Sequence, residues 1–495
     1  MRSTPKFLML AAMAVSTAWL SGCFLGSENS GPTTEDVKAS DKAALSATGN
    51  LETSVANMQK GSYEYGKEDL TSLKSANSDF KEAARLNPGN SKAQLGMAVT
   101  GVLLAAQSQK LSSIINRTVE GKSPFDSRVS EEAPAKRAAV LRQVAEAATW
   151  PEFHEIQDAI ADTMLPALDD AIARLKVVYD DPAFSMMLVI EGEPRELDHV
   201  EVGVLLAGLH AIKGLLTLWL SYDIDIDYNG SYDWIEALDG LDNVEKFSDL
   251  TQAQRDALNK GVTILSPTSP FLAVRPAWKS RLAGVDDEIK SALDILKASV
   301  VSLGQETDPQ ANDLLHLCVP GEEGACMDPD DYQEAKDVID TARKYMSQPY
   351  EVRLADIDTT IKVNFAALFN VQDYKKFMPY YGFYNANEWS DTKPVLYFTN
   401  KSGTITGNIM TLKDIADQAD ANNWTAVQVV DAIRAVIHLQ DPTFQNYLPG
   451  ATEADIWNLI RKQAQYDDEN NWEVAMAKRA VGTMKPGFAL SLLGK

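Results

Sequence analysis

Acidic and amide side chains recur at regular spacing between residues 225 and 236, and the spacing suits a calcium ion. Oxygen ligands at positions 1, 3, 5, 7, 9 and 12 of this loop would come from Asp225, Asp227, Asn229, the carbonyl of Ser231, Asp233 and Glu236. Calcium takes about six to eight oxygens in flexible geometry. Gly230, at position 6, permits the sharp turn. We therefore predict a calcium site here, and no other motif requires a cofactor.

This loop resembles the calcium loop of the EF-hand, because an apolar helix precedes it and a second helical pattern follows. It departs from the EF-hand at position 8, where Tyr232 replaces the usual aliphatic residue, and the chain shows no partner EF-hand. The alternative is an acidic turn at a helix end, in which Asp side chains cap the backbone.

The preceding run, residues 202–220, is the most apolar after the first twenty residues, and we expect it to form a central helix surrounded by other elements. Its length also suits a membrane span. His210 and Lys213 near its middle favour a buried helix, because a central lysine costs about 2.5–3.5 kcal/mol on insertion.

The N-terminus has the pattern of a secretory signal. Arg2 and Lys6 precede a short apolar stretch, residues 7–19, and Leu20-Ser21-Gly22-Cys23 follows. This ending resembles the lipobox of bacterial lipoproteins. The resemblance implies a lipid, diacylglyceryl with palmitate-type chains, on Cys23, and cleavage before it. Phe24 after the cysteine resembles the outer-membrane sorting pattern. An ordinary cleaved signal or an anchor helix is the alternative.

The other cysteines support export. Cys318 and Cys326 lie in one Pro/Gly-containing loop, and an even pair so close in an exported chain predicts a disulfide. His316 alone adds too few ligands for a zinc site.

Seven aromatic residues lie between residues 374 and 389, beside Asn385, Asn387 and Asp391. Flat rings with amides and acids nearby suit the stacking of a sugar, and the candidate stacking residues are Tyr380, Tyr381, Tyr384 and Trp389. The alternative, which we prefer, is that these rings close the core between a small sheet and helices.

The composition and the absence of certain motifs limit the classes of function that the sequence supports. The net charge of -24 disfavours nucleic acid as a partner. Metalloprotease, serine-hydrolase, phosphate-loop and dinucleotide signatures are absent from the sequence, and the five histidines share no ligand spacing. We therefore expect no enzyme activity, with a hydrolase using two of the many carboxylates as the weakest alternative.

Most of the chain has helical periodicity. Ala76, Phe80 and Ala83 share one helix face, and Pro88 ends the helix. This pattern resembles the second helix and exit turn of a tetratricopeptide repeat, although the helix before it has Lys60 and Glu64 at two signature positions. Similar helix exits at Asp181-Pro182 and Asp308-Pro309 suggest an irregular array.

We predict a mainly α fold, an irregular helical array with tetratricopeptide-like (TPR-like) helix pairs and a small β-hairpin or sheet near residues 355–410. Alternation in residues 357–365 and 395–409 indicates strands, with a turn near Asn400 to Gly403. The expected segments are a signal peptide (1–22), a flexible tether (23–48), a TPR-like α-helical domain (49–346) and an α+β region packed on it (347–495).

These features predict an outer-membrane lipoprotein, bound to the membrane through its N-terminal lipid. Helical arrays make concave surfaces that bind proteins, so we expect a non-enzymatic scaffold with an envelope protein partner. The alternative is a lipoprotein that works with a transporter and binds a small solute or glycan.

Overall fold

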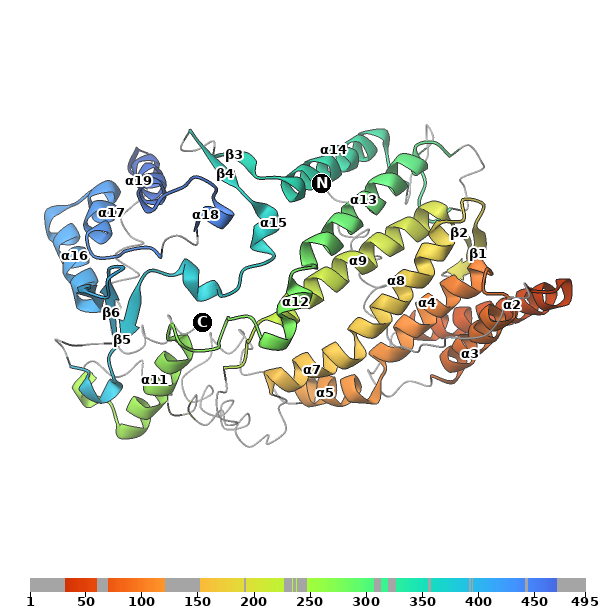
Figure 1. Ribbon diagram of the computed structural model, residues 1–495, viewed down its shortest axis with the longest axis horizontal. Helices are drawn as coiled ribbons and strands as arrows, with labels where there is room; N and C mark the ends of the chain where they lie inside the picture. The colour runs from red at the N-terminus through yellow and green to blue at the C-terminus, as the bar shows by residue number, and fades with distance from the viewer. Residues whose placement is uncertain are drawn as a thin grey trace. The chain divides into compact units, whose positions relative to one another are not determined.

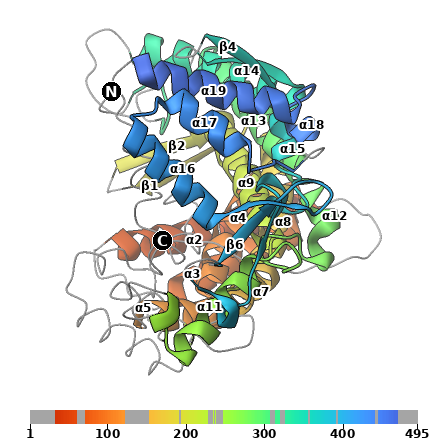
Figure 2. The same cartoon turned by 90° about the vertical axis from the view of Figure 1, so that its left-hand side faces the viewer.

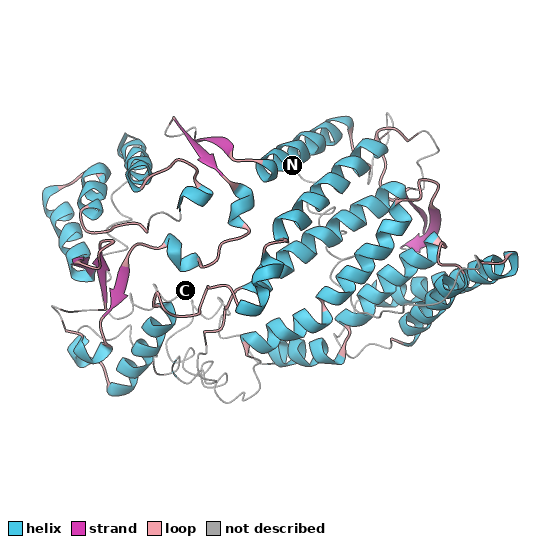
Figure 3. Ribbon diagram, in the orientation of Figure 1, coloured by secondary structure: helices cyan, strands magenta, loops and turns pink. Residues whose placement is uncertain are grey.

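The computed structural model describes residues 32–59, 70–120, 152–190, 193–226, 234, 237, 247–306, 313–318, 326–354, 358–390, 393, 395–440 and 444–469. Helices dominate these residues, and the strands form small sheets of two or three (Figure 1; Figure 3). The predicted mainly α class with a small β region near residues 355–410 is confirmed. The chain forms two compact units, unit 1 (residues 1–120, 154–220 and 280–346) and unit 2 (121–153, 221–279 and 347–495).

The helices of unit 1 follow one another as a connected array. Those lying wholly or mainly in this unit are α2 (Thr34–Gln59), α3 (Thr71–Leu86), α4 (Ser91–Ala106), α5 (Gln109–Glu120), α7 (Phe153–Thr163), α8 (Leu165–Tyr179), α9 (His199–Ser221), α12 (Lys279–Leu282), α13 (Val285–Leu303) and α14 (Pro329–Ser347).

Helices α2, α3 and α4 share one apolar core. Ala76, Phe80 and Ala83 are fully buried on a single face of α3, as their spacing predicts. The Phe80 ring lies against Gly96 of α4, where an added Cβ would approach its ring carbons to 2.3 Å. Small residues on both helices therefore allow the close approach that Phe80 fills.

The turn between α3 and α4 is held by one buried side chain. Asn90 caps α4, since its Oδ1 accepts from the Ala93 N–H at 3.1 Å. Its amide donates to Ser40 Oγ of α2 at 2.9 Å, and Ser40 donates to the carbonyl of Ala83 at 2.7 Å. A cap that also bonds a third helix fixes the angle at which the chain leaves α3.

Residues 34–48 correct the sequence prediction. They were expected in a flexible tether, but they form the first part of α2. Ser40, Ala44 and Ala47 are buried at helical spacing and pack on α3. The polar composition concealed a stripe of small residues, which is enough to bury a helix against a close neighbour.

The array continues through α4, α8, α9, α13 and α14. Arg174 of α8 donates to Gln94 of α4 at 2.8 Å, and Arg343 of α14 pairs with Asp294 of α13. Between them, α9 contacts both α8 and α13, and Figure 1 shows α8, α9 and α13 side by side.

Two features of unit 1 were not predicted. The region 153–179 forms two helices, α7 and α8, because Pro166 stands at the start of α8. An antiparallel hairpin, β1 (Ser185–Ile190) and β2 (Glu193–Asp198), precedes α9. Its buried face is formed by Met186 and Leu197.

Unit 2 contains the remaining sheets. Strands β3 (Tyr350–Leu354) and β4 (Thr359–Val363) form one antiparallel pair, and β5 (Tyr381–Phe383), β6 (Leu396–Thr399) and β7 (Ile405–Asn408) form another antiparallel sheet in that order. The β6–β7 turn lies where the sequence predicts it. Gly403 has φ +79°, and its N–H donates to the carbonyl of Asn400 at 3.0 Å.

Helices of unit 2 begin at strong sequence signals. Thr251, Asn408 and Thr425 each make a reciprocal capping box with the residue three positions on. Figure 2 shows α16, α17 and α19 layered one on the next. The elements of this unit are α11 (Gln252–Leu265), α15 (Phe365–Leu368), α16 (Ile409–Asn422), α17 (Ala426–Arg434), α18 (Phe444–Tyr447), α19 (Glu453–Glu469) and the 3-10 turns η3 (Phe247–Asp249), η4 (Pro276–Trp278), η7 (Tyr374–Phe377) and η8 (Ala386–Glu388).

Candidate functional site

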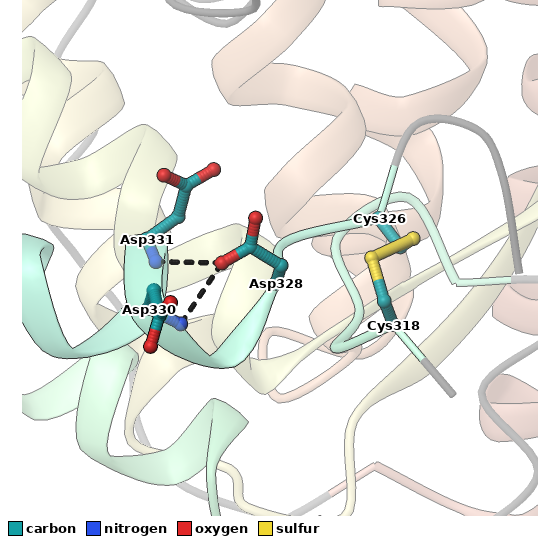
Figure 4. The surroundings of a disulfide bond; sticks show 5 residues. All are labelled: Cys318, Cys326, Asp328, Asp330 and Asp331. Atoms are coloured by element: carbon teal, nitrogen blue, oxygen red, sulfur yellow. Dashed lines mark hydrogen bonds between the residues drawn. A yellow bond between two sulfur atoms is a disulfide. The ribbon is translucent and has the colours of Figure 1, made fainter. Parts of the chain in front are cut away.

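The predicted disulfide is present. Cys318 and Cys326 are bonded, with Cα atoms 4.9 Å apart (Figure 4). Asp328 follows the bridge and caps α14, where its Oδ1 accepts from the N–H groups of Asp330 and Asp331 at 2.9 and 2.8 Å. The loop that the disulfide closes therefore leads directly into helix α14, which Asp328 caps.

The segment before the bridge is fastened to the start of α9 by a buried carboxyl group. Glu201 is 3% exposed, and its two oxygens accept from the N–H groups of Asp198 and Leu315, each at 2.9 Å. Burial, together with the neighbouring Asp198 carboxyl, raises the pKa of Glu201 to about 8. The group therefore joins three segments of unit 1 and keeps its proton near neutral pH.

Polar residues of α9 form an ion cluster with its neighbours. His210 Nδ1 and Lys213 Nζ each lie 2.6 Å from a carboxylate oxygen of Glu288, and Lys213 also lies 2.7 Å from Asp169. Burial opposes the charge of Lys213, but hydrogen bonds to the two carboxylates outweigh it and raise its pKa. Burial likewise opposes ionisation of Glu288, but its two partners hold the pKa of that carboxyl below the usual value.

Among the described residues, α9 is the one helix long and apolar enough to cross a membrane by length and composition, and 39% of its most apolar window is buried. Its two charged or ionisable residues in mid-helix are paired with α8 and α13. This pairing favours the interpretation of α9 as a packed helix of unit 1.

The four candidate stacking residues lie in different surroundings. Trp389 is 4% exposed, belongs to a core cluster with Leu258 and Val395, and donates from its indole to the carbonyl of Tyr384. Tyr381 donates to the carbonyl of Leu265 at 2.6 Å, and burial raises its pKa to about 12. These contacts support the alternative, a role in the core.

The other two rings are partly buried. Tyr384 packs on Tyr397, with ring centroids 4.9 Å apart, and Lys393 lies 5.0 Å from its ring. Tyr380 bonds through its backbone N–H to the carbonyl of His438. Sugar stacking on these residues stays a prediction.

The predicted calcium ligands lie mostly outside the described residues, as does Cys23. Of the six predicted ligand residues, the structure describes Asp225, which is buried and whose N–H donates to Asp223 at 3.1 Å. Elsewhere in the described part of the chain, no group of three or more His, Cys, Asp or Glu could hold a metal ion. The calcium site stays a prediction, and calorimetric titration with and without Glu236→Ala tests it.

A pocket of about 620 Å³ lies among α3, α4 and α5, and we call it the α3–α5 pocket. Leu70 and Leu104 form its apolar wall, and Lys74 gives it a cation. Its other lining residues are amides and hydroxyls, namely Gln107, Ser108, Gln109, Ser112 and Ser113. This volume falls within the range of small-molecule sites, about 300–1,000 Å³.

No sequence pattern predicted this pocket. One signal was present: Ser112 stands between Leu111 and Ile114, and all three are buried. A serine on the buried face of a helix indicates either a local hydrogen bond or a ligand.

Comparison of the chain with protein-family models, with curated proteins and with solved structures found no match.

Proposed function

We propose that the chain is a lipid-anchored protein of the bacterial envelope, in the outer membrane, whose helical body binds a protein partner as a scaffold. The observation that carries the proposal is the Cys318–Cys326 disulfide, because such bonds persist mainly in exported proteins. The sequence Leu20-Ser21-Gly22-Cys23 supplies a matching anchor, since two or three acyl chains hold a protein stably at a membrane.

The surface of unit 1 supports a protein partner. Leu215 and Trp219 lie one turn apart on α9 and are 54% and 36% exposed. Tryptophan is enriched among the residues that contribute most to protein interfaces. An array of helices that shows such side chains suits the scaffold role better than catalysis.

The second candidate function is capture of a small solute or glycan beside a transporter. The α3–α5 pocket favours it, because a protein scaffold has no need of a polar pocket of this volume.

Fractionation of the envelope tests the anchor and the partner together. We expect the full chain to sediment with outer membranes and to retain a stoichiometric protein partner after detergent extraction and crosslinking. The Cys23→Ala variant should lose the membrane association but keep the folded body. Wild-type protein that remains in the cytosol would contradict the proposal.

If the protein is membrane-bound but no partner is recovered, and a sugar or organic acid co-purifies instead, the second candidate replaces the first. The anchor and the binding role are therefore tested by separate readouts of one preparation.

A further inference from the structure

The lining of the α3–α5 pocket is unusual in charge for this protein. The chain has 70 acidic and 46 basic residues. Among the described residues that line the pocket, Lys74 is nevertheless the charged one, and none of them is a carboxylate. A site with this lining favours an anion, whereas the acidic surface around it favours cations.

Two helix N-termini border the pocket and add to its positive potential. Helix α3 begins after Leu70, which makes no side-chain cap, and α5 begins after Ser108, whose Oγ accepts from the N–H of Leu111 at 3.3 Å. Neither first turn contains an acidic residue. N-terminal N–H groups and the helix dipole favour a bound anion at such positions.

One buried hydroxyl points to a ligand independently of the charge. Ser112 lines the pocket and is 8% exposed, and its Oγ has no hydrogen-bond partner among the described residues. The adjacent Ser113 does have one, since its hydroxyl donates to the carbonyl of Lys110 at 2.9 Å. A buried hydroxyl without a partner is costly, and a polar ligand would provide the missing bond.

We propose that the α3–α5 pocket binds a small hydroxylated carboxylate, of the sugar-acid class. Lys74 and the first turns of α3 and α5 receive the carboxylate. Ser112 and Gln109 bond the hydroxyl groups, and the last carbonyls of α4 add acceptors for them. Leu70 and Leu104 cover the carbon skeleton.

The chemistry of the pocket excludes three neighbouring ligand classes. A purely apolar ligand would leave Ser112 without a partner, and a neutral sugar would not use the positive potential. Inorganic anions would leave the apolar wall uncovered. The ligand therefore combines one negative charge, hydroxyl groups and a short carbon chain or ring.

Calorimetric titration of the detergent-purified full chain tests the proposal, with D-glucuronate and D-gluconate as probes and D-glucose as the neutral counterpart. We expect at least one of the two acids to bind with a Kd of about 1 mM or tighter, and D-glucose to bind at least tenfold more weakly. Absence of heat with both acids, or equal affinity for D-glucose, would overturn it.

Variants locate the binding. Lys74→Gln removes the charge and should weaken binding of the acid about tenfold or more, since it removes a charge-assisted hydrogen bond to the carboxylate. Lys81→Gln is the matched control, because Lys81 is an exposed lysine two turns further along α3 and does not line the pocket. Equal effects of the two substitutions would contradict the assignment.

Ser112→Ala separates binding from folding. It should weaken binding of the acid severalfold. The melting temperature of the ligand-free protein should stay unchanged or rise, because the substitution removes an unpartnered hydroxyl. Unchanged affinity would show that Ser112 does not bond the ligand and would contradict the proposal. The inference rests on the second proposed function, solute capture, and is independent of the anchor: failure of Cys23 acylation would leave these titrations unaffected.

Discussion

At the scale of single residues, the packing of α3 on α4 depends on a glycine that faces an aromatic ring. Gly96 lies against Phe80, and Phe80 is fully buried. Gly49, in the middle of α2, has nothing within 4 Å of the position its Cβ would take. The two glycines therefore offer a matched pair in which the same substitution meets opposite surroundings.

Gly96→Ala should lower the free energy of unfolding by about 1–2 kcal/mol, because overpacking costs about 1–3 kcal/mol and the gain in helix propensity recovers less than that. Gly49→Ala should raise it by about 0.5–1 kcal/mol, since alanine limits the unfolded chain and favours the helix. Urea unfolding measures both. Stabilisation by both substitutions would show that Phe80 does not pack on Gly96.

The raised pKa of Glu201 makes the stability of the fold depend on pH. Its pKa is about 8 in the folded protein, and the unfolded chain has the ordinary value of 4.5. Between these values the folded state holds a proton that the unfolded state has released, so the stabilisation is complete below pH 4.5 and is lost as the pH rises through 8.

We expect the free energy of unfolding to decrease by at least about 1 kcal/mol from pH 5 to pH 8 on account of this group. Glu201→Gln, which cannot ionise, should flatten that slope. A slope that is the same in both proteins would show that Glu201 is already ionised when folded.

At the scale of elements, the disulfide secures the segment between α13 and α14. The backbone on either side of it pairs within itself, since the Cys318 N–H donates to Met327 and the Met327 N–H donates to His316. Leu315 also holds Glu201 at the start of α9. Loss of the bridge is therefore expected to loosen both the loop and the N-terminus of α9.

Reduction, or the double substitution Cys318→Ser and Cys326→Ser, should lower stability by about 2–3 kcal/mol, the chain-entropy value for so short a loop. Thermal unfolding with and without reductant measures it, and the double variant should no longer respond to reductant. If reductant left the wild-type melting temperature unchanged, the loop would be held by its other contacts alone.

Elements with strong local signals could be predicted from the sequence. Helix α3 combines Ala76, Phe80 and Ala83 on one face with a proline exit, and the β6–β7 hairpin combines alternation with a glycine turn. The first part of α2, residues 34–48, was missed because its buried face is made mostly of Ser and Ala, which contribute little hydrophobic contrast. The β1–β2 hairpin was missed because β1 is almost entirely apolar and β2 is mostly charged, so neither strand alternates with period two.

The candidate sites also differ in how far local sequence patterns could predict them. The disulfide could be predicted because its two cysteines lie eight positions apart in one loop. The α3–α5 pocket could not, because its lining comes from three helices and none of its residue types is unusual on its own. Lys74 and Ser112 come together only through helix packing, which no local sequence pattern predicts.

At the scale of the whole molecule, the full chain has a net charge of -24, and we propose that its helical body is held at a bacterial envelope. Such a charge repels anionic headgroups, so the proposed attachment would come from the N-terminal lipid and not from the protein surface. The anchor, the disulfide and the binding roles all require export of the chain.

Mass spectrometry of the mature N-terminus tests that claim most directly. We predict a first residue of Cys23 that carries a diacylglyceryl thioether and a fatty acid on its amine, with residues 1–22 removed. A mature chain that starts elsewhere, or an unmodified Cys23 on a protein recovered from the cytosol, would contradict it.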